Sequence, residues 1–433
     1  MQGPPSLIKW SKYRAGYCFN LEIMKVSVLT LGCRVNQAES SVLKGTLEEN
    51  GITIVELKEK PNFCIVNTCT VTAKSDYNSR QLIRRAARAG AKVIVTGCYA
   101  QLRKNEISKI PGEIELIDNT RKYDIANLIT GKENIPVFSH FSRSRPYLKV
   151  QDGCNFRCSY CSVPLARGIS RSVPLSEVLN RVRAIEGGGY NEIVLTGIHL
   201  GSYGKDLAEK TSLKQLIKYI LKSSSIKRIR LSSLEINEVD EELIELMQDI
   251  RLCSHLHLPL QSGSDKILKL MRRNYASSEF SAKLEDIFSK IDNISVGSDI
   301  IAGFPGEGDI EFMYTYDFLK AFPFAYLHVF PFSVRPDTEA GKMHDRVQNH
   351  VIKKRVDRLM ELGREKKRSY FQKQVHGVLD VIIEEKNVDH HSLGTSGNYI
   401  KVAVHGNNIK KGSLVSVKIL SSRDNILEGF IIP

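Results

Sequence analysis

No apolar run in the 433-residue sequence approaches the roughly 18 residues that a membrane-spanning helix needs. The first 24 residues contain Lys and Arg but no apolar core, which excludes a secretory signal peptide. We expect residues 1–24 to be a disordered leader, or Met24 to be the true start, because the first apolar strand begins just after it. These absences predict a cytoplasmic protein with no membrane partner.

Acidic residues are also in short supply. The chain has 48 Asp and Glu against 62 Lys and Arg, which gives a formal net charge of +14. A basic excess favours a polyanionic partner such as nucleic acid, although many basic proteins bind none. Apolar residues make up 42% and charged residues 25%, ordinary values for a globular chain of about two to four domains.

Nine cysteines in a chain without an export signal indicate a reducing compartment and favour metal ligation over disulfides. Cys154, Cys158 and Cys161 have the spacing C-x3-C-x2-C on one short loop. No other Cys and no His lies between Pro146 and Ile198, so the fourth ligand of a closed structural zinc site is missing. Three thiolates can instead hold three irons of a cubane cluster and leave the fourth iron open for chemistry. The loop therefore predicts a reactive iron–sulfur site, with structural zinc as the alternative.

The first segment, residues 25–141, alternates apolar strands at 26–31, 64–68 and 92–96 with helices at 37–49 and 79–89. This alternation predicts an amino-terminal α/β domain with a parallel sheet. Cys33, Cys69 and Cys98 each lie at or just past the carboxyl end of a strand, the edge where such sheets bind ligands. We expect them to converge on a second three-cysteine cluster site. The alternative is that each is a small buried apolar residue.

The central segment, residues 142–370, repeats six βα units with strands at 147–150, 192–195, 228–231, 255–260, 295–301 and 325–330. The pattern predicts a partial (β/α)6 barrel with its active site at the carboxyl ends of the strands. The cysteine loop and the turns at 196–199, 232–235, 261–263 and 302–306 should share that rim. His199, His255 and His257 are more readily explained as hydrogen-bonded core residues than as catalytic ones.

A glycine run, Gly187-Gly188-Gly189, precedes the second of these strands. Glycines allow a close approach of the backbone, here to the amino-acid end of a bound nucleotide cofactor, and a turn that ends a helix is the alternative. The tail, residues 371–433, has apolar strands at 378–384, 398–404, 414–420 and 426–431. It predicts a small antiparallel β-barrel, a type of fold that often holds loops of nucleic acid.

The motifs together resemble one family. The cysteine loop, with an aromatic Tyr160 before its last cysteine, looks like the radical S-adenosylmethionine (SAM) loop. The segments TLGCRVNQ (30–37), NTCTVT (67–72) and TGCYAQ (96–101) resemble the amino-terminal domain of methylthiotransferases. QDGC (151–154), ARG (166–168), LPLQSGS (258–264) and IIAGFPGE (300–307) also match, and the tail is similar to a TRAM RNA-binding domain. The resemblance covers residues 25–433.

This resemblance implies a tRNA methylthiotransferase that adds a methylthio group to C2 of a modified adenosine at tRNA position 37. GCRVNQ at Cys33 and TCTVT at Cys69 look like the branch that acts on N6-threonylcarbamoyladenosine, whereas the isopentenyladenosine branch typically has GCQMN. Cys154, Cys158 and Cys161 would hold a [4Fe-4S] cluster that binds SAM and gives a 5'-deoxyadenosyl radical. Cys33, Cys69 and Cys98 would hold an auxiliary [4Fe-4S] cluster for the inserted sulfur, and a second SAM would supply the methyl group.

No side chain is assigned as a catalytic acid or base, because the clusters and the cofactor carry the chemistry. The residues expected to contact the cofactor lie on the barrel rim, apart from the two glycines: Tyr160, Gly188, Gly189, Thr196, Ser233, Glu235 and Gln261. The residues expected to contact RNA recur at helical spacing near the auxiliary cysteines: Arg80, Arg84, Arg85 and Arg88. The expected partners are the tRNA anticodon arm, an electron donor of the flavodoxin or ferredoxin type, and a sulfur donor.

Three other functions compete with this interpretation. Two share its chemistry, methylthiolation of isopentenyladenosine-37 and methylthiolation of a ribosomal-protein aspartate. The third is a non-catalytic iron–sulfur protein that binds RNA. Both cysteine triads lack a fourth ligand, which suits substrate chemistry better than electron storage.

Overall fold

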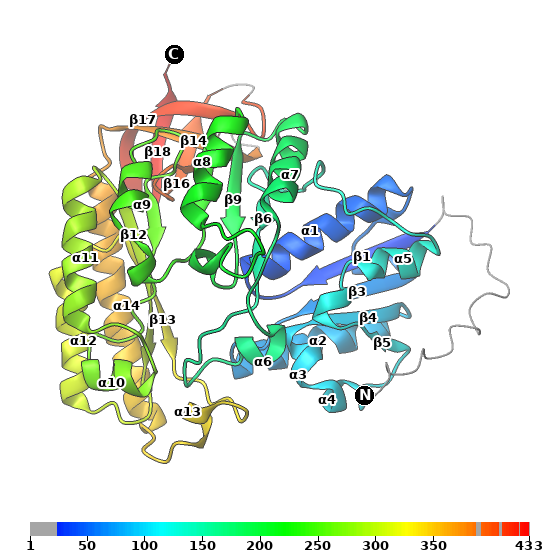
Figure 1. Ribbon diagram of the computed structural model, residues 1–433, viewed down its shortest axis with the longest axis horizontal. Coiled ribbons are helices and arrows are strands. Elements are labelled where there is room, and N and C mark those ends of the chain that lie inside the picture. Colours follow the sequence, from blue (N-terminus) through cyan, green and yellow to red (C-terminus); the bar gives the residue numbers. More distant parts are fainter. Residues whose placement is uncertain (1–23, 387–390, 407–408, 424, 433) are drawn as a thin grey trace.

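The computed structural model describes residues 24–386, 391–406, 409–423 and 425–432 (Figure 1). The expected leader, apart from Met24, lies outside the described residues. An amino-terminal sheet domain, a central set of parallel strands inside a row of helices, and a carboxyl-terminal barrel follow one another along the chain (Figure 1). In the described residues no helix is long and apolar enough to cross a membrane. The predicted domain limits at 141/142 and 370/371 stay predictions.

The amino-terminal domain is built on a five-stranded, all-parallel sheet in the order β2-β1-β3-β4-β5. Its helices α1 (Arg34–Glu49) and α5 (Asp124–Thr130) pack on one face and α2 (Ala73–Arg88) on the other. Because both faces are covered, the central strands are almost wholly apolar, which made them visible in the sequence. The strands are β1 (Lys25–Thr30), β2 (Thr53–Ile54), β3 (Phe63–Thr68), β4 (Lys92–Gly97) and β5 (Ile114–Leu116). The short edge strands β2 and β5 were not predicted.

The central segment has the six predicted strands, all parallel, in two sheets of order β10-β9-β6 and β11-β12-β13. A bridge between Ile229 and Leu252 joins the two sheets into a partial barrel. The strands are β6 (Tyr147–Lys149), β9 (Glu192–Thr196), β10 (Arg228–Leu231), β11 (His255–His257), β12 (Ser295–Ala302) and β13 (Tyr326–Pro331). An additional hairpin, β7 (Gln151–Asp152) with β8 (Arg171–Ser172), brackets the cysteine loop and the short helix α6 (Val163–Arg167).

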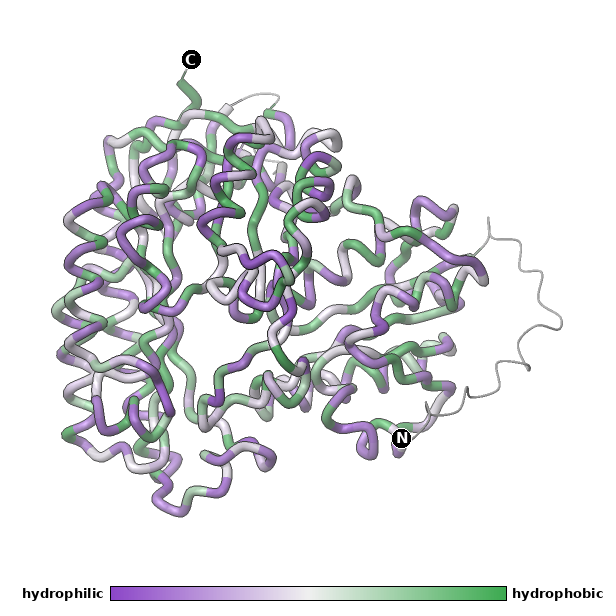
Figure 2. The backbone as a smooth tube through the Cα atoms, in the orientation of Figure 1, coloured by the Kyte–Doolittle hydropathy of each residue, from purple (hydrophilic) through white to green (hydrophobic). Residues whose placement is uncertain are grey.

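Helices cover the outside of this barrel. Figure 2 shows hydrophilic and hydrophobic residues alternating along the outer helices, as expected where one face of a helix packs on a sheet. The helices are α7 (Leu175–Gly187), α8 (Leu213–Ser223), α9 (Glu241–Leu246), α10 (Asp265–Leu270), α11 (Ser277–Lys290), α12 (Asp309–Ala321) and α14 (Asn349–Gln372). One large apolar core lies between these helices and the strands.

The tail forms a closed barrel in the strand order β14-β15-β16-β18-β17. It differs from the prediction in two respects. The strand β15 (His391–Ser396) was missed because its sequence, HSLGTS, lacks apolar alternation, and β16 pairs with β18 in parallel rather than antiparallel. The other strands are β14 (Val378–Lys386), β16 (Lys401–His405), β17 (Leu414–Arg423) and β18 (Ile426–Ile431).

The tail barrel docks on the amino-terminal ends of the central strands, opposite the rim that carries the cysteine loop. Arg230 donates to the carbonyl oxygens of Ser396 and Gly397, at 2.8 and 2.9 Å. The buried Glu192 carboxylate pairs with Arg230 from the first position of β9. Tyr399 follows these carbonyls, and its hydroxyl accepts a hydrogen bond of 3.0 Å from Arg34 of α1. All three parts of the chain therefore meet at Tyr399.

Candidate active site

The cysteine loop is fixed by a glycine that no other residue could replace. Gly153 has φ +72°, and a Cβ atom there would lie 1.9 Å from the carbonyl oxygen of Ile169. The backbone N–H of Cys154 donates to the carbonyl of Gly168 at 3.1 Å. The loop is thus held against the segment that follows α6, with its three thiols side by side and none in a disulfide.

Two polar side chains reach the thiols of this loop. His199 places Nδ1 3.8 Å from Cys154 Sγ and Nε2 2.5 Å from a carboxylate oxygen of Glu238. Burial lowers the pKa of His199, but its hydrogen bonds to Cys154 and Glu238 outweigh burial and raise the pKa to about 9. Arg273 donates to Cys158 Sγ at 3.6 Å. Burial raises the pKa of Cys158, and the charge of Arg273 acts against that rise, toward the thiolate form that a metal cluster requires. These residues therefore fit an iron–sulfur cluster.

The second triad comes together as the strand order dictates. Cys33, Cys69 and Cys98 follow β1, β3 and β4, which are neighbours in the sheet. Gly32 has φ +96°, and a Cβ atom there would lie 2.7 Å from the Cβ of Cys69. Burial raises the pKa of the Cys69 thiol to about 11, and electrostatic interactions with Cys98 and Cys33 act in the same direction. The three thiols are thus close to one another, and the cysteines are free rather than in disulfides.

A buried network of charges connects the two triads. Arg167, which ends α6 behind the cysteine loop, donates to Asn36 Oδ1 at 2.5 Å and pairs with Glu39 at 3.1 Å. Asn36 in turn donates to the carbonyl oxygens of Leu31 and Thr68, at 2.8 and 2.9 Å, just before two of the auxiliary cysteines. The guanidinium of Arg167 also interacts electrostatically with Cys33 and Cys98. One arginine therefore ties both cysteine sites to a single interface.

The structure places most of the predicted cofactor residues on the rim. Thr196 ends β9, and Gln261 is buried with φ +66°, its N–H donating to the carbonyl of Asp299 at 2.8 Å. The ring of Tyr160 packs edge-on against Phe304. Ser233 is exposed directly after β10.

Glu235 also lies on this rim. Its carboxylate pairs with Arg273, the residue that donates to Cys158. These placements agree with a cofactor site, and the individual contacts stay a prediction.

Gly188 and Gly189 do not lie on the rim. They end α7 and precede β9, at the amino-terminal end of the barrel strands. Because the cysteine loop is at the other end, the structure supports the alternative interpretation of a turn that ends a helix. His255 and His257 conform to the default expectation, since both hydrogen bond to the hydroxyl of Tyr326, at 2.8 and 3.1 Å.

The four predicted RNA-contacting arginines all lie on α2 but differ in their surroundings. Arg80 pairs with Glu106 at 3.1 Å and donates to the hydroxyl of Tyr99 at 3.2 Å. Arg84, Arg85 and Arg88 are exposed. These three arginines are therefore available to a partner, whereas Arg80 is engaged by Glu106 and Tyr99.

Two family models match the chain. "Uncharacterized protein family UPF0004" matches residues 25–118, and "Radical SAM superfamily" matches residues 148–319. A threonylcarbamoyladenosine tRNA methylthiotransferase MtaB from Bacillus subtilis (strain 168) is 37% identical over 92% of this chain and 94% of its own length. One from Aquifex aeolicus (strain VF5) is 36% identical over 92% of this chain and 100% of its own length. The chain belongs to the radical SAM methylthiotransferase family.

One further relative is named for a different substrate, and one solved structure shares the fold. A tRNA-2-methylthio-N(6)-dimethylallyladenosine synthase from Thermodesulfovibrio yellowstonii (strain ATCC 51303 / DSM 11347 / YP87) is 30% identical over 94% of this chain and 98% of its own length. The radical SAM methyltransferase TsrM from Kitasatospora setae has a similar fold, with a TM-score of 0.56, 15% identity, and coverage of 73% of this chain and 75% of that one. This methylthiotransferase is an enzyme that uses SAM and two [4Fe-4S] clusters.

The residues that sequence reasoning missed reach the site from a distance. Arg273 follows α10 and touches Cys158, 115 positions earlier in the chain. Glu39 and Asn36 belong to α1 and contact Arg167, about 130 residues later. Among these, Asn36 and Arg167 lay in segments that had been singled out, TLGCRVNQ (30–37) and ARG (166–168), but neither motif marked the contact between them. The others were single polar residues in a helix or turn, with no local pattern to mark them.

Proposed function

We propose that this methylthiotransferase modifies tRNA by adding a methylthio group to C2 of N6-threonylcarbamoyladenosine at position 37. The observation that carries the proposal is the 37% identity, over 92% of the chain, to an enzyme named for that substrate. The relatives from Aquifex aeolicus and Thermotoga maritima carry the same name, and GCRVNQ at Cys33 agrees with that branch. The product would be 2-methylthio-N6-threonylcarbamoyladenosine.

The two cysteine triads have separate roles in this proposal. The triad on the barrel rim would hold the cluster that binds SAM, and the triad on the sheet edge would hold the auxiliary cluster. When bound, the clusters supply the electron that cleaves SAM and the sulfur that is transferred. Arg273 and His199 stabilise negative charge on the rim cysteines. Gly153 and the Arg167 network hold the two triads in fixed positions relative to each other.

Binding of tRNA would use basic surface on more than one part of the chain. Arg84, Arg85 and Arg88 lie exposed on α2, in the same domain as the auxiliary cysteines. The tail barrel adds Lys401, Lys410, Lys411 and Lys418. An anticodon arm is a polyanion whose loop bases are splayed, so basic surface of this kind fits this substrate. An electron donor of the flavodoxin or ferredoxin type and a sulfur donor complete the set of partners.

The dimethylallyladenosine synthase from Thermodesulfovibrio yellowstonii, at 30% identity, makes isopentenyladenosine-37 the second candidate substrate. Mass spectrometry of nucleosides from the tRNA of a deletion strain distinguishes the two. We expect loss of 2-methylthio-N6-threonylcarbamoyladenosine, accumulation of its unmethylthiolated precursor, and no change in isopentenyladenosine derivatives. Re-expression of the wild type should restore the product and Cys33→Ala should not. An unchanged threonylcarbamoyladenosine profile would rule out the proposal.

A further inference from the structure

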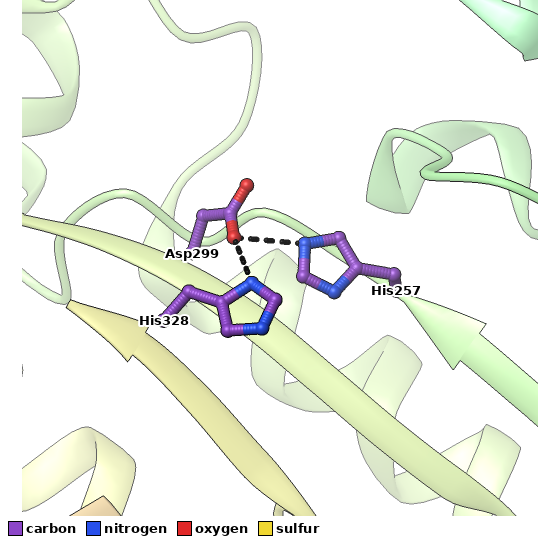
Figure 3. Close-up of side chains that lie close together, drawn as sticks. All are labelled: His257, Asp299 and His328. Atoms are coloured by element: carbon purple, nitrogen blue, oxygen red, sulfur yellow. Dashed lines mark hydrogen bonds and ion pairs between the residues drawn. The ribbon is translucent and has the colours of Figure 1, made fainter. Parts of the chain in front are cut away.

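Three polar side chains that belong to neither cysteine triad meet inside the barrel. His257 comes from β11, Asp299 from β12 and His328 from β13 (Figure 3). Their neighbours Val296, Ile300 and Leu327 face outward into the core under the helices. Because side chains alternate along a strand, the three polar residues face the interior of the barrel.

The hydrogen bonds of this trio leave two polar atoms without a partner. His257 Nε2 and His328 Nδ1 lie 2.9 and 3.1 Å from one and the same oxygen, Oδ1 of Asp299 (Figure 3). His257 uses its second nitrogen on the hydroxyl of Tyr326. In the described residues no hydrogen bond reaches Oδ2 of Asp299 or Nε2 of His328. The side chains of Asp299 and His328 are 26% and 53% exposed, so a ligand can reach these two atoms.

Both open atoms are able to hydrogen bond a ligand. Burial raises the pKa of Asp299, but the bonds from His257 and His328 outweigh it and keep this carboxyl ionised, so Oδ2 is an acceptor. His328 turns Nδ1 toward that anion, so its other ring nitrogen, Nε2, points away from it (Figure 3). The pair is therefore able to accept one hydrogen bond at Oδ2 and to form a second one at Nε2 with the same ligand.

Asp299 and His328 lie below the rim of the barrel, at a depth that a substituent could reach from a base bound at the rim. His328 is three residues before the end of β13 at Pro331, which places its Cα about 10 Å below the rim. An apolar N6 substituent lying there would cover two polar atoms and offer them nothing. A site built to hydrogen bond its substrate rejects an analogue that lacks the polar group by factors of roughly ten thousand.

We propose that Asp299 and His328 form the subsite that recognises the polar N6 substituent of the target adenosine. The threonyl hydroxyl or a ureido N–H would donate to Asp299 Oδ2, and a second polar group of the same substituent would hydrogen bond to His328 Nε2. This inference rests on the proposed function and assigns its specificity to named atoms. His257 holds the carboxylate of Asp299 from the other side, and Tyr326 in turn hydrogen bonds to His257.

The test compares anaerobic binding of wild type and variants to two tRNAs that differ only in the threonylcarbamoyl group at position 37. We expect the reconstituted wild type to bind the modified tRNA more tightly, and His328→Phe to lose about tenfold or more of that preference. His328→Gln, which keeps a side chain able to hydrogen bond, should regain part of it. Iron content equal to that of the wild type shows that each variant has folded and loaded its clusters.

Three results would overturn the inference. One is an unchanged preference in His328→Phe. Another is a loss of affinity in His328→Phe that is equal for both tRNAs. The third is a stoichiometric divalent metal, beyond the iron of the clusters, in the wild type but not in His328→Phe, because the three ligand atoms lie within 4.8 Å of one another and would then be a metal site.

Failure of the proposed function is distinguishable from failure of this inference. In the first case the wild type itself would not methylthiolate the threonylcarbamoylated tRNA. In the second case it would do so, and the preference would not depend on His328.

Discussion

Replacing Glu39 by Gln would remove a carboxylate shared by three cations between the amino-terminal domain and the barrel. Its side chain is 1% exposed and pairs with Lys122, Lys149 and Arg167. Lys149 and Arg167 keep Asp152 as a second carboxylate, at 3.3 and 2.8 Å. Lys122, whose side chain is 2% exposed, has no other ion pair among the described residues. The substitution therefore leaves one buried ammonium group without a counterion.

The size of the effect follows from that isolated charge. Breaking a buried ion pair by removing one partner costs about 3–5 kcal/mol. Burial already lowers the pKa of Lys122, so the amine can lose its proton instead of staying charged. We therefore expect a loss in the free energy of unfolding near the lower limit, ~3 kcal/mol. A double variant, Glu39→Gln with Lys122→Met, removes both charges and should regain most of the loss, because apolar replacement of a whole pair is nearly neutral.

Urea unfolding of the cluster-free protein at pH 7, followed by circular dichroism, measures this difference. Glu56→Gln is the matched control in the same domain. Its carboxylate pairs with Lys58 on the surface, where the two side chains are 72% and 78% exposed, so its loss should hardly move the unfolding midpoint. Equal midpoint shifts for Glu39→Gln and Glu56→Gln would refute the reasoning, as would a double variant less stable than Glu39→Gln.

Three further predictions concern acid stability, cluster loading and RNA affinity. Burial raises the pKa of Glu192, but three arginines outweigh it and lower this pKa to about 2. The carboxylate therefore stabilises the fold above about pH 4.5, and this stabilisation is lost as the pH falls toward 2. In an acid titration followed by circular dichroism, Glu192→Gln should lose less stability between these pH values than the wild type. Gly153→Ala forces a Cβ atom onto a backbone carbonyl, and iron analysis should show about four irons fewer than in the wild type, whereas a full complement would contradict the geometry. Arg84→Glu with Arg85→Glu should weaken tRNA binding and lower the salt dependence of log Kd by about two or more; unchanged affinity and slope would exclude this face of α2.

The strands that precede the auxiliary cysteines were predictable because each is a short apolar run with a glycine or cysteine at its carboxyl end or within two residues after it. Cys33, Cys69 and Cys98 could be expected to converge from the rule that parallel strands end at one edge. The strand order that makes them neighbours came from the structure. The strand β15 was missed because its polar sequence carries no periodic signal, although closure of the barrel requires it.

Side-chain partners of the site were not predictable in the same way. Arg273, Glu39 and His328 are single residues whose partners lie on other elements, so no spacing along the chain marks them. Gly188 and Gly189 show the reverse case, in which a clear local pattern led to a cofactor-binding role that their place in the barrel does not favour. A glycine run is a strong local pattern, but its meaning depended on which end of a barrel strand it adjoins.

The docking of the tail changes how that domain can be studied. Arg228 and Arg230, in the floor of the barrel, donate to main-chain carbonyls of the tail, and Tyr399 reaches Arg34, next to Cys33. The tail is therefore not an interchangeable module. A truncation before residue 371 would expose the buried guanidinium groups of Arg228 and Arg230 and remove the hydrogen-bond partner of Arg34, beside Cys33. Loss of activity in a truncated enzyme would therefore not measure RNA binding alone. A hybrid enzyme with another relative's tail would need the same carbonyl geometry and a tyrosine at position 399 to keep the barrel floor intact.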